Sequence, residues 1–342
     1  MSTVIRSPNW IGDGIMSLPA IRAFKSNFPD QRLAVLAKSY LADIYLNIPE
    51  IDEIISLPDR FSARSCFSSL RQLRGKRFER GVLFTNSFSS ALLFRLAAIP
   101  HIAGYGRDGR SWLLHDRVPA PPQDEHQQHF YLRIIQHLAG KKTGAAFPAT
   151  LVVTDAEKRW ADLWLAEQGI RPGTPLLAVA PAAAYGSAKA WPPDRFREVV
   201  RAWGESHPQA AVLLLGAAGE RQRIAAMAEG LTGTVFNLAG LLELRRSIAV
   251  LSRCRLFLGN DSGMMHVAAA LRLPLLALFG PTRPDRTAPL TDRFRLIYHG
   301  ADCAPCNRRR CPTDQRCLTA IGVDEVLAAA EELWAEAPRE TE

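Results

Sequence analysis

The residues with the clearest chemical potential lie in one loop of the second half of the sequence. This loop is Gly259-Asn260-Asp261-Ser262-Gly263-Met264-Met265-His266, and it follows the predicted strand 255–258. A helix that begins with Ser and Gly presents backbone N–H groups and the positive end of its dipole to a diphosphate. His266 follows Ser262 by four residues, so both side chains share one face of that helix. The alternative for Asp261 by itself is an ordinary helix N-cap.

A second loop of the same kind covers residues 181–192, directly after the predicted strand 176–180. It consists mostly of small residues and contains one cation, Lys189. Lys189 is a candidate for contact with a phosphate because loops that follow the strands of a parallel sheet form its ligand sites. The alternative is an exposed loop lysine, which is the commoner fate of a lone Lys.

A third loop follows the predicted strand 211–215 and contains Gly216-Ala217-Ala218-Gly219-Glu220. Glycines allow a backbone to approach a ligand closely, and an acidic side chain at this position accepts hydrogen bonds from ribose hydroxyls. Glu220 is therefore a candidate for nucleotide binding. The alternative is a plain turn with Glu220 in the first turn of a helix, where the helix dipole favours it.

One carboxylate of the first half occupies a comparable position. The turn after the first predicted strand contains Asn9-Trp10-Ile11-Gly12-Asp13-Gly14, which lacks the G-x-G-x-x-G pattern of dinucleotide sites. Asp13 stands between two glycines at the start of a helical pattern. The spacing alone favours a helix cap, and the alternative is a general base at the active site.

Four cysteines lie close together near the end of the sequence. They are Cys303, Cys306, Cys311 and Cys317, and they are interleaved with the arginines at 308–310. Their compact spacing is compatible with structural zinc, while disulfides are disfavoured in a reducing compartment. The arginines are either solvated charge or a contact for phosphate and lipid headgroups. Cys66 and Cys254 are interpreted as ordinary buried thiols.

The elements that position these loops follow an alternation of strands and helices. Strands are predicted at 3–6, 32–37, 81–85, 101–104, 176–180, 211–215, 255–258 and 275–279, and helices at 13–27, 87–97 and 323–336. Such alternation is typical of doubly wound α/β folds with parallel sheets. The pattern dissolves between 141 and 154, so we predict two domains, 1–150 and 151–342.

Composition limits the classes of function. The 342 residues fit two domains at roughly 150 residues each, and a hydrophobic content of 47% supports sizeable cores. No apolar run approaches the ~20 residues that cross a bilayer, and the first residues lack a secretory pattern, so a cytoplasmic location is expected. A net charge of +8 favours anionic partners. The arginines are not gathered into aromatic-interleaved patches, so nucleic acid is not expected as a partner.

Together these motifs resemble the bacterial lipopolysaccharide heptosyltransferases, glycosyltransferase family 9, and most closely the heptosyltransferase II branch. The resemblance covers nearly the whole chain and rests on residues 7–20, 85–91, 181–192, 260–270 and 279–282. The cysteine-rich segment that ends at Cys317 is also found in part of this family.

The resemblance implies an α/β fold of the GT-B type, with two doubly wound Rossmann-like lobes facing across a cleft. The N-terminal lobe would bind the acceptor and the C-terminal lobe the nucleotide sugar. It implies an inverting transfer of L-glycero-D-manno-heptose from ADP-heptose to the heptose–Kdo–lipid A core, without metal or other cofactor. It also implies peripheral contact with the cytoplasmic face of the inner membrane.

The resemblance further assigns roles to individual residues. Asp13 resembles the base that deprotonates the acceptor hydroxyl, and Lys189 resembles the cation that stabilises the departing ADP. The implied donor-binding residues are Ala184, Tyr185, Lys189, Glu220, Asp261, Ser262, Gly263 and His266. The implied acceptor-binding residues are Asn9, Asn86, Arg60, Arg107 and Arg110.

The sequence departs from the family pattern at Ala182, Ala190 and Gly259. Ala190 stands where a basic residue usually precedes Trp191, and Arg283 or Arg286 is a candidate to replace that charge. Two other functions therefore stay open. One is a related transferase that adds a first or third heptose or another sugar, and the other is a nucleotide-sugar binding protein without turnover.

Overall fold

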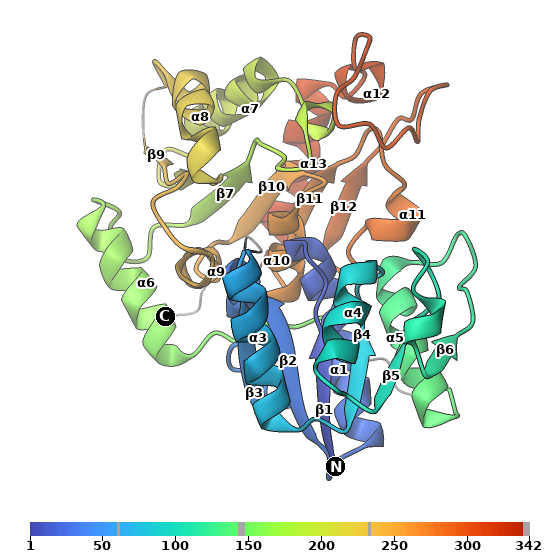
Figure 1. The fold of residues 1–342 in the computed structure, drawn as a ribbon. Helices are drawn as coiled ribbons and strands as arrows, with labels where there is room; N and C mark the ends of the chain where they lie inside the picture. The colour runs from blue at the N-terminus through green and yellow to red at the C-terminus, as the bar shows by residue number, and fades with distance from the viewer. Residues whose placement is uncertain (60–61, 143–147, 232–233, 338–342) are drawn as a thin grey trace. The chain divides into compact units, whose positions relative to one another are not determined.

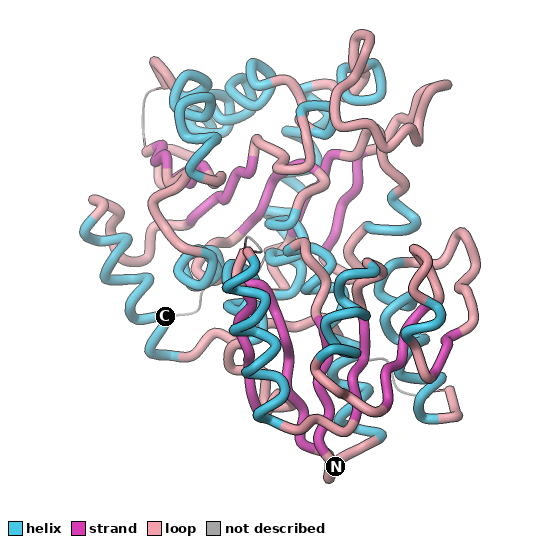
Figure 2. Tube along the Cα trace, viewed as in Figure 1, coloured by secondary structure: helices cyan, strands magenta, loops and turns pink. Residues whose placement is uncertain are grey.

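The computed structural model describes residues 1–59, 62–142, 148–231 and 234–337. The chain divides into two compact units, Met1–Val152 and Val153–Glu342, close to the boundary expected at residue 150. Each unit contains a six-stranded sheet with helices around it (Figure 1). Strands and helices alternate along the trace of each unit (Figure 2). The predicted α/β class is confirmed.

The N-terminal unit is built on a parallel sheet of order β3-β2-β1-β4-β5-β6. Its strands are β1 (Ser2–Arg6), β2 (Arg32–Lys38), β3 (Glu53–Leu57), β4 (Arg80–Leu83), β5 (His101–Tyr105) and β6 (Asp116–Val118). Its helices are α1 (Ile11–Asn27), α2 (Ser39–Ala42), α3 (Ala63–Lys76), α4 (Phe88–Leu96) and α5 (Gln127–Ala139), with 3-10 turns η1 (Asp43–Tyr45) and η2 (Ser111–Leu113). In the central strand β1, Ile5 lies between Val35 and Val82. All three are fully buried, because helices cover both faces of a parallel sheet.

The C-terminal unit is built on a parallel sheet of order β12-β11-β10-β7-β8-β9. Its strands are β7 (Leu176–Ala180), β8 (Ala211–Leu214), β9 (Val235–Asn237), β10 (Leu256–Asn260), β11 (Leu275–Leu278) and β12 (Phe294–Ile297). Its helices are α6 (Asp155–Glu167), α7 (Pro193–Ser206), α8 (Arg221–Ala228), α9 (Leu244–Leu251), α10 (Gly263–Ala270), α11 (Pro284–Thr287), α12 (Arg316–Thr319) and α13 (Val323–Glu336), with 3-10 turns η3 (Ser187–Lys189) and η4 (Ala218–Glu220).

Helix α7 illustrates how this unit forms its core. Pro193 occupies the first turn, where the missing N–H costs nothing. Phe196, Val199, Val200 and Trp203 are buried and recur at the spacing of one helical face. Trp203 meets Trp334 of α13 edge to face, with ring centroids 5.1 Å apart. This packing fixes α7 and α13 against the sheet.

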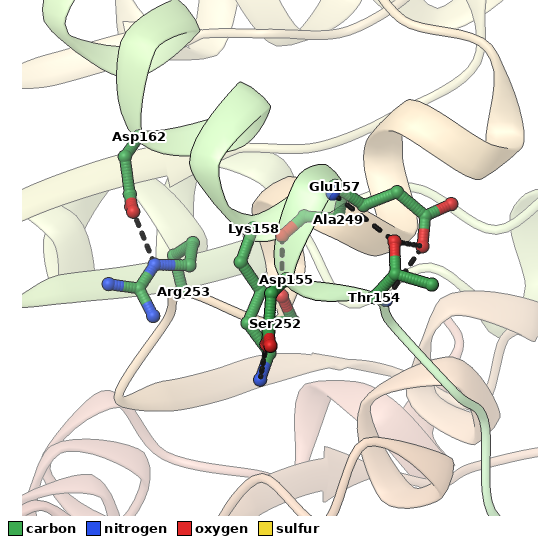
Figure 3. A network of polar contacts seen from close by, with 8 residues as sticks. All are labelled: Thr154, Asp155, Glu157, Lys158, Asp162, Ala249, Ser252 and Arg253. Atoms are coloured by element: carbon green, nitrogen blue, oxygen red, sulfur yellow. Dashed lines mark hydrogen bonds and ion pairs between the residues drawn. The ribbon is translucent and has the colours of Figure 1, made fainter.

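Charged groups join α6 and α9 at the start of the C-terminal unit. The hydroxyl of Thr154 accepts a hydrogen bond from the backbone N–H of Glu157, and the Glu157 carboxylate accepts from the backbone N–H of Thr154 (Figure 3). Arg245 of α9 makes a bidentate contact with the same carboxylate, at 2.6 and 2.7 Å. Figure 3 also shows Arg253 paired with Asp162 of α6, at 2.6 Å. Hydrogen bonds from Arg245 lower the pKa of Glu157 to about 2.

The two sheets have the same topology. Counted from its own first strand, each has the order 3-2-1-4-5-6, so the direction of winding reverses between the first and fourth strands. These are β1 and β4 in one unit and β7 and β10 in the other. Ligands of doubly wound sheets bind beyond the carboxyl ends of the strands at this reversal. The loops that carry Asp13, Asn86, Lys189 and Asp261 follow these four strands, whereas the Glu220 loop follows β8.

Four strands of the structure were not predicted from the sequence pattern. β3, β6, β9 and β12 are the outermost strands of their sheets.

Cys254 is buried as expected, and burial raises the pKa of its thiol. The expectation for Cys66 was wrong, because Cys66 lies on the exposed side of α3. Among the described residues, every helix is too short or too polar to span a bilayer.

Candidate active site

Asn260 closes the 181–192 loop at both ends. This fully buried side chain is the last residue of β10. Its Oδ1 accepts a 2.9 Å hydrogen bond from the backbone N–H of Trp191, and its Nδ2 donates to the carbonyl of Pro181 at 3.0 Å. The sequence motif contained Asn260 but did not reveal this role. An amide at the end of an otherwise apolar buried strand was the available signal.

Lys189, Asp261 and Thr282 bring three loops together. The Lys189 ammonium lies 2.5 Å from Oδ2 of Asp261, and the Thr282 hydroxyl donates to the same oxygen at 2.6 Å. The Asp261 side chain is 6% exposed and that of Lys189 is 13% exposed. The alternative of Asp261 as a helix cap was wrong, because Ser262 is the N-cap residue of α10. Lys189 is likewise not an ordinary solvated lysine.

The start of α10 carries a buried polar atom that is suited to a ligand. The Oγ of Ser262 is inaccessible to solvent and has no hydrogen-bond partner among the described residues. A buried hydroxyl left in this state costs about 1–3 kcal/mol, which a ligand oxygen would recover. Gly263 begins the helix, and His266 is buried within its second turn. The structure thus brings Ser262, Gly263 and His266 into the same turns as Asp261.

Tyr185 and Glu220 also have defined partners. The Tyr185 hydroxyl donates to the carbonyl of Asn307 at 2.8 Å, and its ring lies 5.0 Å from the Lys189 ammonium. Ala184, beside it, is exposed. One carboxylate oxygen of Glu220 accepts from the backbone N–H of Ala217 at 2.8 Å. Glu220 therefore has the helix-start role considered above, and ribose contact stays a prediction for it.

Asp13 is held by a tyrosine of another helix. It is the third residue of α1, whose N-cap residue is Trp10 without a side-chain cap bond, so the helix-cap interpretation was wrong. Oδ1 of Asp13 instead accepts a 3.0 Å hydrogen bond from the hydroxyl of Tyr131 in α5. Burial, together with the Asp13 charge, raises the pKa of Tyr131 well above its ordinary value. Tyr131 therefore stays protonated and remains a donor.

Asn9 is positioned by a buried arginine that the sequence analysis missed. Arg6 ends β1 and is 4% exposed. Its guanidinium donates to Oδ1 of Asn9 at 2.7 Å and to the carbonyl of Ser7 at 2.6 Å. Burial lowers the pKa of Arg6 to about 10, which leaves the group charged at neutral pH. A cation at the end of a buried strand was the available signal.

The expectation of direct acceptor contact by Arg110 needs correction. Arg110 is fully buried, and it donates to the carbonyls of Tyr105 and Thr85 at 2.9 and 2.5 Å. Its remaining nitrogen lies 3.3 Å from Oδ1 of Asn86, and burial lowers its pKa to about 10. Arg110 therefore orients the loop that carries Asn86.

Arg107 and Arg60 have different outcomes. Arg107 is exposed, with its guanidinium 5.9 Å from the ring centroid of Phe130, so it remains available to an anionic ligand. Arg60 lies outside the described residues. Acceptor contact stays a prediction for both arginines and for the two asparagines.

The four late cysteines do not form a metal-ligand cluster in this structure. Cys317 packs into the hydrophobic core, whereas Cys303 is exposed and the other two are half-buried. Burial raises the pKa of the Cys317 thiol, and its three cysteine neighbours raise it further. Within the described ranges, no three His, Cys, Asp or Glu side chains gather as metal ligands. The four thiols are near enough to influence one another's charge, but in the described residues they are not arranged as metal ligands.

The fold and these strand-end residues define the class of protein. Each unit has a parallel sheet with the same winding and polar residues at the reversal point. This is the fold of GT-B type glycosyltransferases, to which the matching solved structure belongs. The chain belongs to glycosyltransferase family 9 (heptosyltransferase), whose family model matches residues 66–316. The predicted resemblance is confirmed.

Individual relatives extend this similarity over most of the chain. The sequence is 31% identical to lipopolysaccharide heptosyltransferase 2 of Salmonella typhimurium, over 87% of this chain and 88% of the relative. It is 30% identical to the Escherichia coli K12 enzyme of the same name, over the same shares. The solved structure of E. coli ADP-heptose LPS heptosyltransferase II superposes with a TM-score of 0.84 at 26% identity, covering 98% of this chain and 99% of the other.

Proposed function

We propose that this glycosyltransferase moves L-glycero-D-manno-heptose from ADP-heptose to the heptose–Kdo–lipid A inner core. The names of the relatives support the donor, the sugar and the lipopolysaccharide acceptor. The observation that carries the proposal is the buried Lys189–Asp261 pair beside the unpartnered Ser262 hydroxyl. Fixed donors at a helix start suit a diphosphate.

On the donor side, negative charge develops on ADP as its bond to the sugar breaks. Lys189 has three N–H donors, of which one is directed at Asp261, so it is able to share its charge with a phosphate oxygen. Ser262 and the backbone N–H groups at the start of α10 would provide further donors. Preorganised donors of this kind stabilise a leaving group without reorganisation.

On the acceptor side, Asp13 would take the proton of the acceptor hydroxyl. The hydroxyl oxygen forms a bond to the anomeric carbon, and the bond from that carbon to the phosphate oxygen breaks with its electron pair leaving on ADP. The configuration inverts in this single displacement. The hydrogen bond from Tyr131 orients the Asp13 carboxylate, and a positioned carboxylate is an established type of general base.

Asn9, Asn86 and Arg107 are the proposed contacts for the anionic acceptor, together with Arg60. Arg6 and Arg110 would act indirectly, by fixing the two asparagines. The net charge of +8 supports peripheral, electrostatic contact with an anionic membrane at the cytoplasmic face of the inner membrane. Such contact weakens as salt is raised.

A transfer assay tests the proposal with ADP-heptose and a Kdo–lipid A acceptor that bears one heptose. The native protein, Asp13→Asn and the exposed control Asp30→Asn are compared in EDTA. We expect the native protein and the control to transfer heptose, and Asp13→Asn to lose at least about 100-fold in rate while it still binds ADP. Native ADP binding without transfer to this acceptor would contradict the proposed acceptor or sugar, and shorter and longer acceptors would then distinguish a related transferase from a binding protein.

A further inference from the structure

The cysteine-rich loop, residues 303–317, lies directly against the 181–192 loop. The backbone N–H of Ala188 donates to the carbonyl of Arg309 at 3.1 Å, and the side chain of Gln315 donates to the carbonyl of Ser187 at 2.6 Å. The hydrogen bond from Tyr185 to Asn307 is a third link. A segment more than a hundred residues away in sequence therefore braces the loop that carries Lys189.

Gly186 makes this close approach feasible. Its φ is +154°, and a Cβ placed there would lie 2.3 Å from the carbonyl oxygen of Arg309. Any side chain at this position would push the two loops apart. The contact between the loops thus depends on a glycine at position 186.

This contact brings a second cation to the ring of Tyr185. The guanidinium carbon of Arg309 lies 5.4 Å from the ring centroid, and the Lys189 ammonium lies 5.0 Å from the same centroid. Aromatic rings attract cations at such distances. Two positive groups therefore lie within 5.4 Å of the centroid of one ring.

The charge of Arg309 is not neutralised by the protein. Arg309 is exposed, and no ion pair involves its guanidinium in the part of the chain that the structure describes. Lys189, in contrast, is paired with Asp261, and Arg283 is paired with Asp285. Arg283 is therefore a weaker substitute for the basic residue that Ala190 replaces. Arg309 supplies an uncompensated positive charge at the same tyrosine ring that Lys189 approaches.

We propose that Arg309 binds the diphosphate of the nucleotide sugar as a second cation, which the cysteine-rich loop delivers to the 181–192 loop. This inference rests on the proposed nucleotide-sugar donor. A guanidinium forms two parallel hydrogen bonds to a phosphate group, and such bonds would strengthen as charge builds on the departing ADP. The cysteine-rich loop is then part of the donor site as well as part of the core.

Calorimetric titration of ADP and adenosine into purified protein tests this assignment. Arg309→Ala and Arg309→Lys are compared with Arg308→Ala, a control from the same exposed loop for which no ring contact is present among the described residues. We expect Arg309→Ala to weaken ADP binding about 10-fold, Arg309→Lys to weaken it less, and adenosine binding to change less than about 2-fold in every variant.

Three outcomes would overturn the assignment: native ADP affinity in Arg309→Ala, an equal loss for adenosine and ADP, or an equal loss in Arg308→Ala. The second outcome would mean that the substitution disturbs the loop instead of removing a phosphate contact. The result is separate from the transfer assay. Native protein that binds ADP but transfers no heptose contradicts the proposed reaction. The ADP affinity of Arg309→Ala relative to that of the native protein still decides the role of Arg309.

Discussion

The hydroxyl of Tyr131 donates a 3.0 Å hydrogen bond to Oδ1 of Asp13 and so joins α5 to the first turn of α1. A carboxylate in the first helical turn has several rotamers available, and this bond selects among them. Because Tyr131 is buried and its pKa is raised well above the ordinary value, the phenol keeps its proton throughout the physiological range. Asp13 thus has a permanent donor on one oxygen.

Removal of this donor tests whether the orientation of Asp13 matters for catalysis. We expect Tyr131→Phe to lower kcat about 10-fold with little change in the KM for the donor, since positioning of a base contributes mainly to the chemical step. Tyr298→Phe in the C-terminal unit serves as the control. Steady-state rates, with melting temperatures to verify folding, decide the outcome, and a native kcat in Tyr131→Phe would contradict the positioning role.

Arg110 provides a test of stability. Arg110→Ala leaves buried carbonyls of Thr85 and Tyr105 without their donor, so we expect a loss of about 3 kcal/mol in the free energy of unfolding. Arg107→Ala, at an exposed position three residues away, should change it by less than about 0.5 kcal/mol. Urea denaturation of both variants makes the comparison. Equal losses of unfolding free energy in the two variants would contradict the structural role assigned to the buried Arg110 side chain.

Glu157 makes a contribution to stability that depends on pH. Its pKa is lowered from 4.5 to about 2, chiefly by Arg245, so the stabilisation is complete above about pH 4.5 and is lost as the pH falls toward 2. We expect Glu157→Gln to cost about 3 kcal/mol at pH 7 and clearly less at pH 3.

Glu205→Gln is the matched control for this experiment, because Glu205 forms an exposed pair with Arg201. Its cost should stay below about 1 kcal/mol. Urea titrations at the two pH values measure both variants. A cost of Glu157→Gln that is the same at pH 3 and pH 7 would rule out the ion pair as its source.

Gly186 tests the link between the two loops of the C-terminal unit. In Gly186→Ala the new Cβ would lie 2.3 Å from the Arg309 carbonyl oxygen, whereas a Cβ at Gly204 of α7 has no neighbour within 4 Å. We expect ADP affinity to fall at least about 10-fold in Gly186→Ala and to stay unchanged in Gly204→Ala. Titration of ADP distinguishes the two. Native affinity in both variants would show that the loops do not need this close contact.

The central part of each sheet was predictable from the sequence because strands such as 176–180 are buried on both faces and consist of apolar residues. The outer strands were not. β12 contains Arg295, and all three residues of β9 are half-buried, so neither has a periodic signal. Edge strands depend on the neighbour with which they pair, and that neighbour is distant in sequence.

The site was predictable as a set of loops but not as a set of contacts. The positions of Lys189 and Asp261 after two strands followed from the sequence, but their 2.5 Å ion pair depends on the adjacency of β7 and β10. The burial of Arg110 could not be deduced either, because an arginine in a polar turn is normally exposed. Its main-chain partners in other segments leave no pattern in the sequence, unlike Arg6 and Asn260, which stand out as polar residues at the ends of buried strands.

The double hydrogen bond of Asn260 to residues 181 and 191 holds both ends of one loop in the folded protein before any ligand binds. Because one side chain fastens both ends of this loop, the entropy of closing it is lost during folding and not when the nucleotide arrives. Substitutions inside the loop, such as Ala182 and Ala190, would then change its chemistry while both of its ends stay fastened to the end of β10. The loop is preorganised for its ligand by a residue that lies outside it.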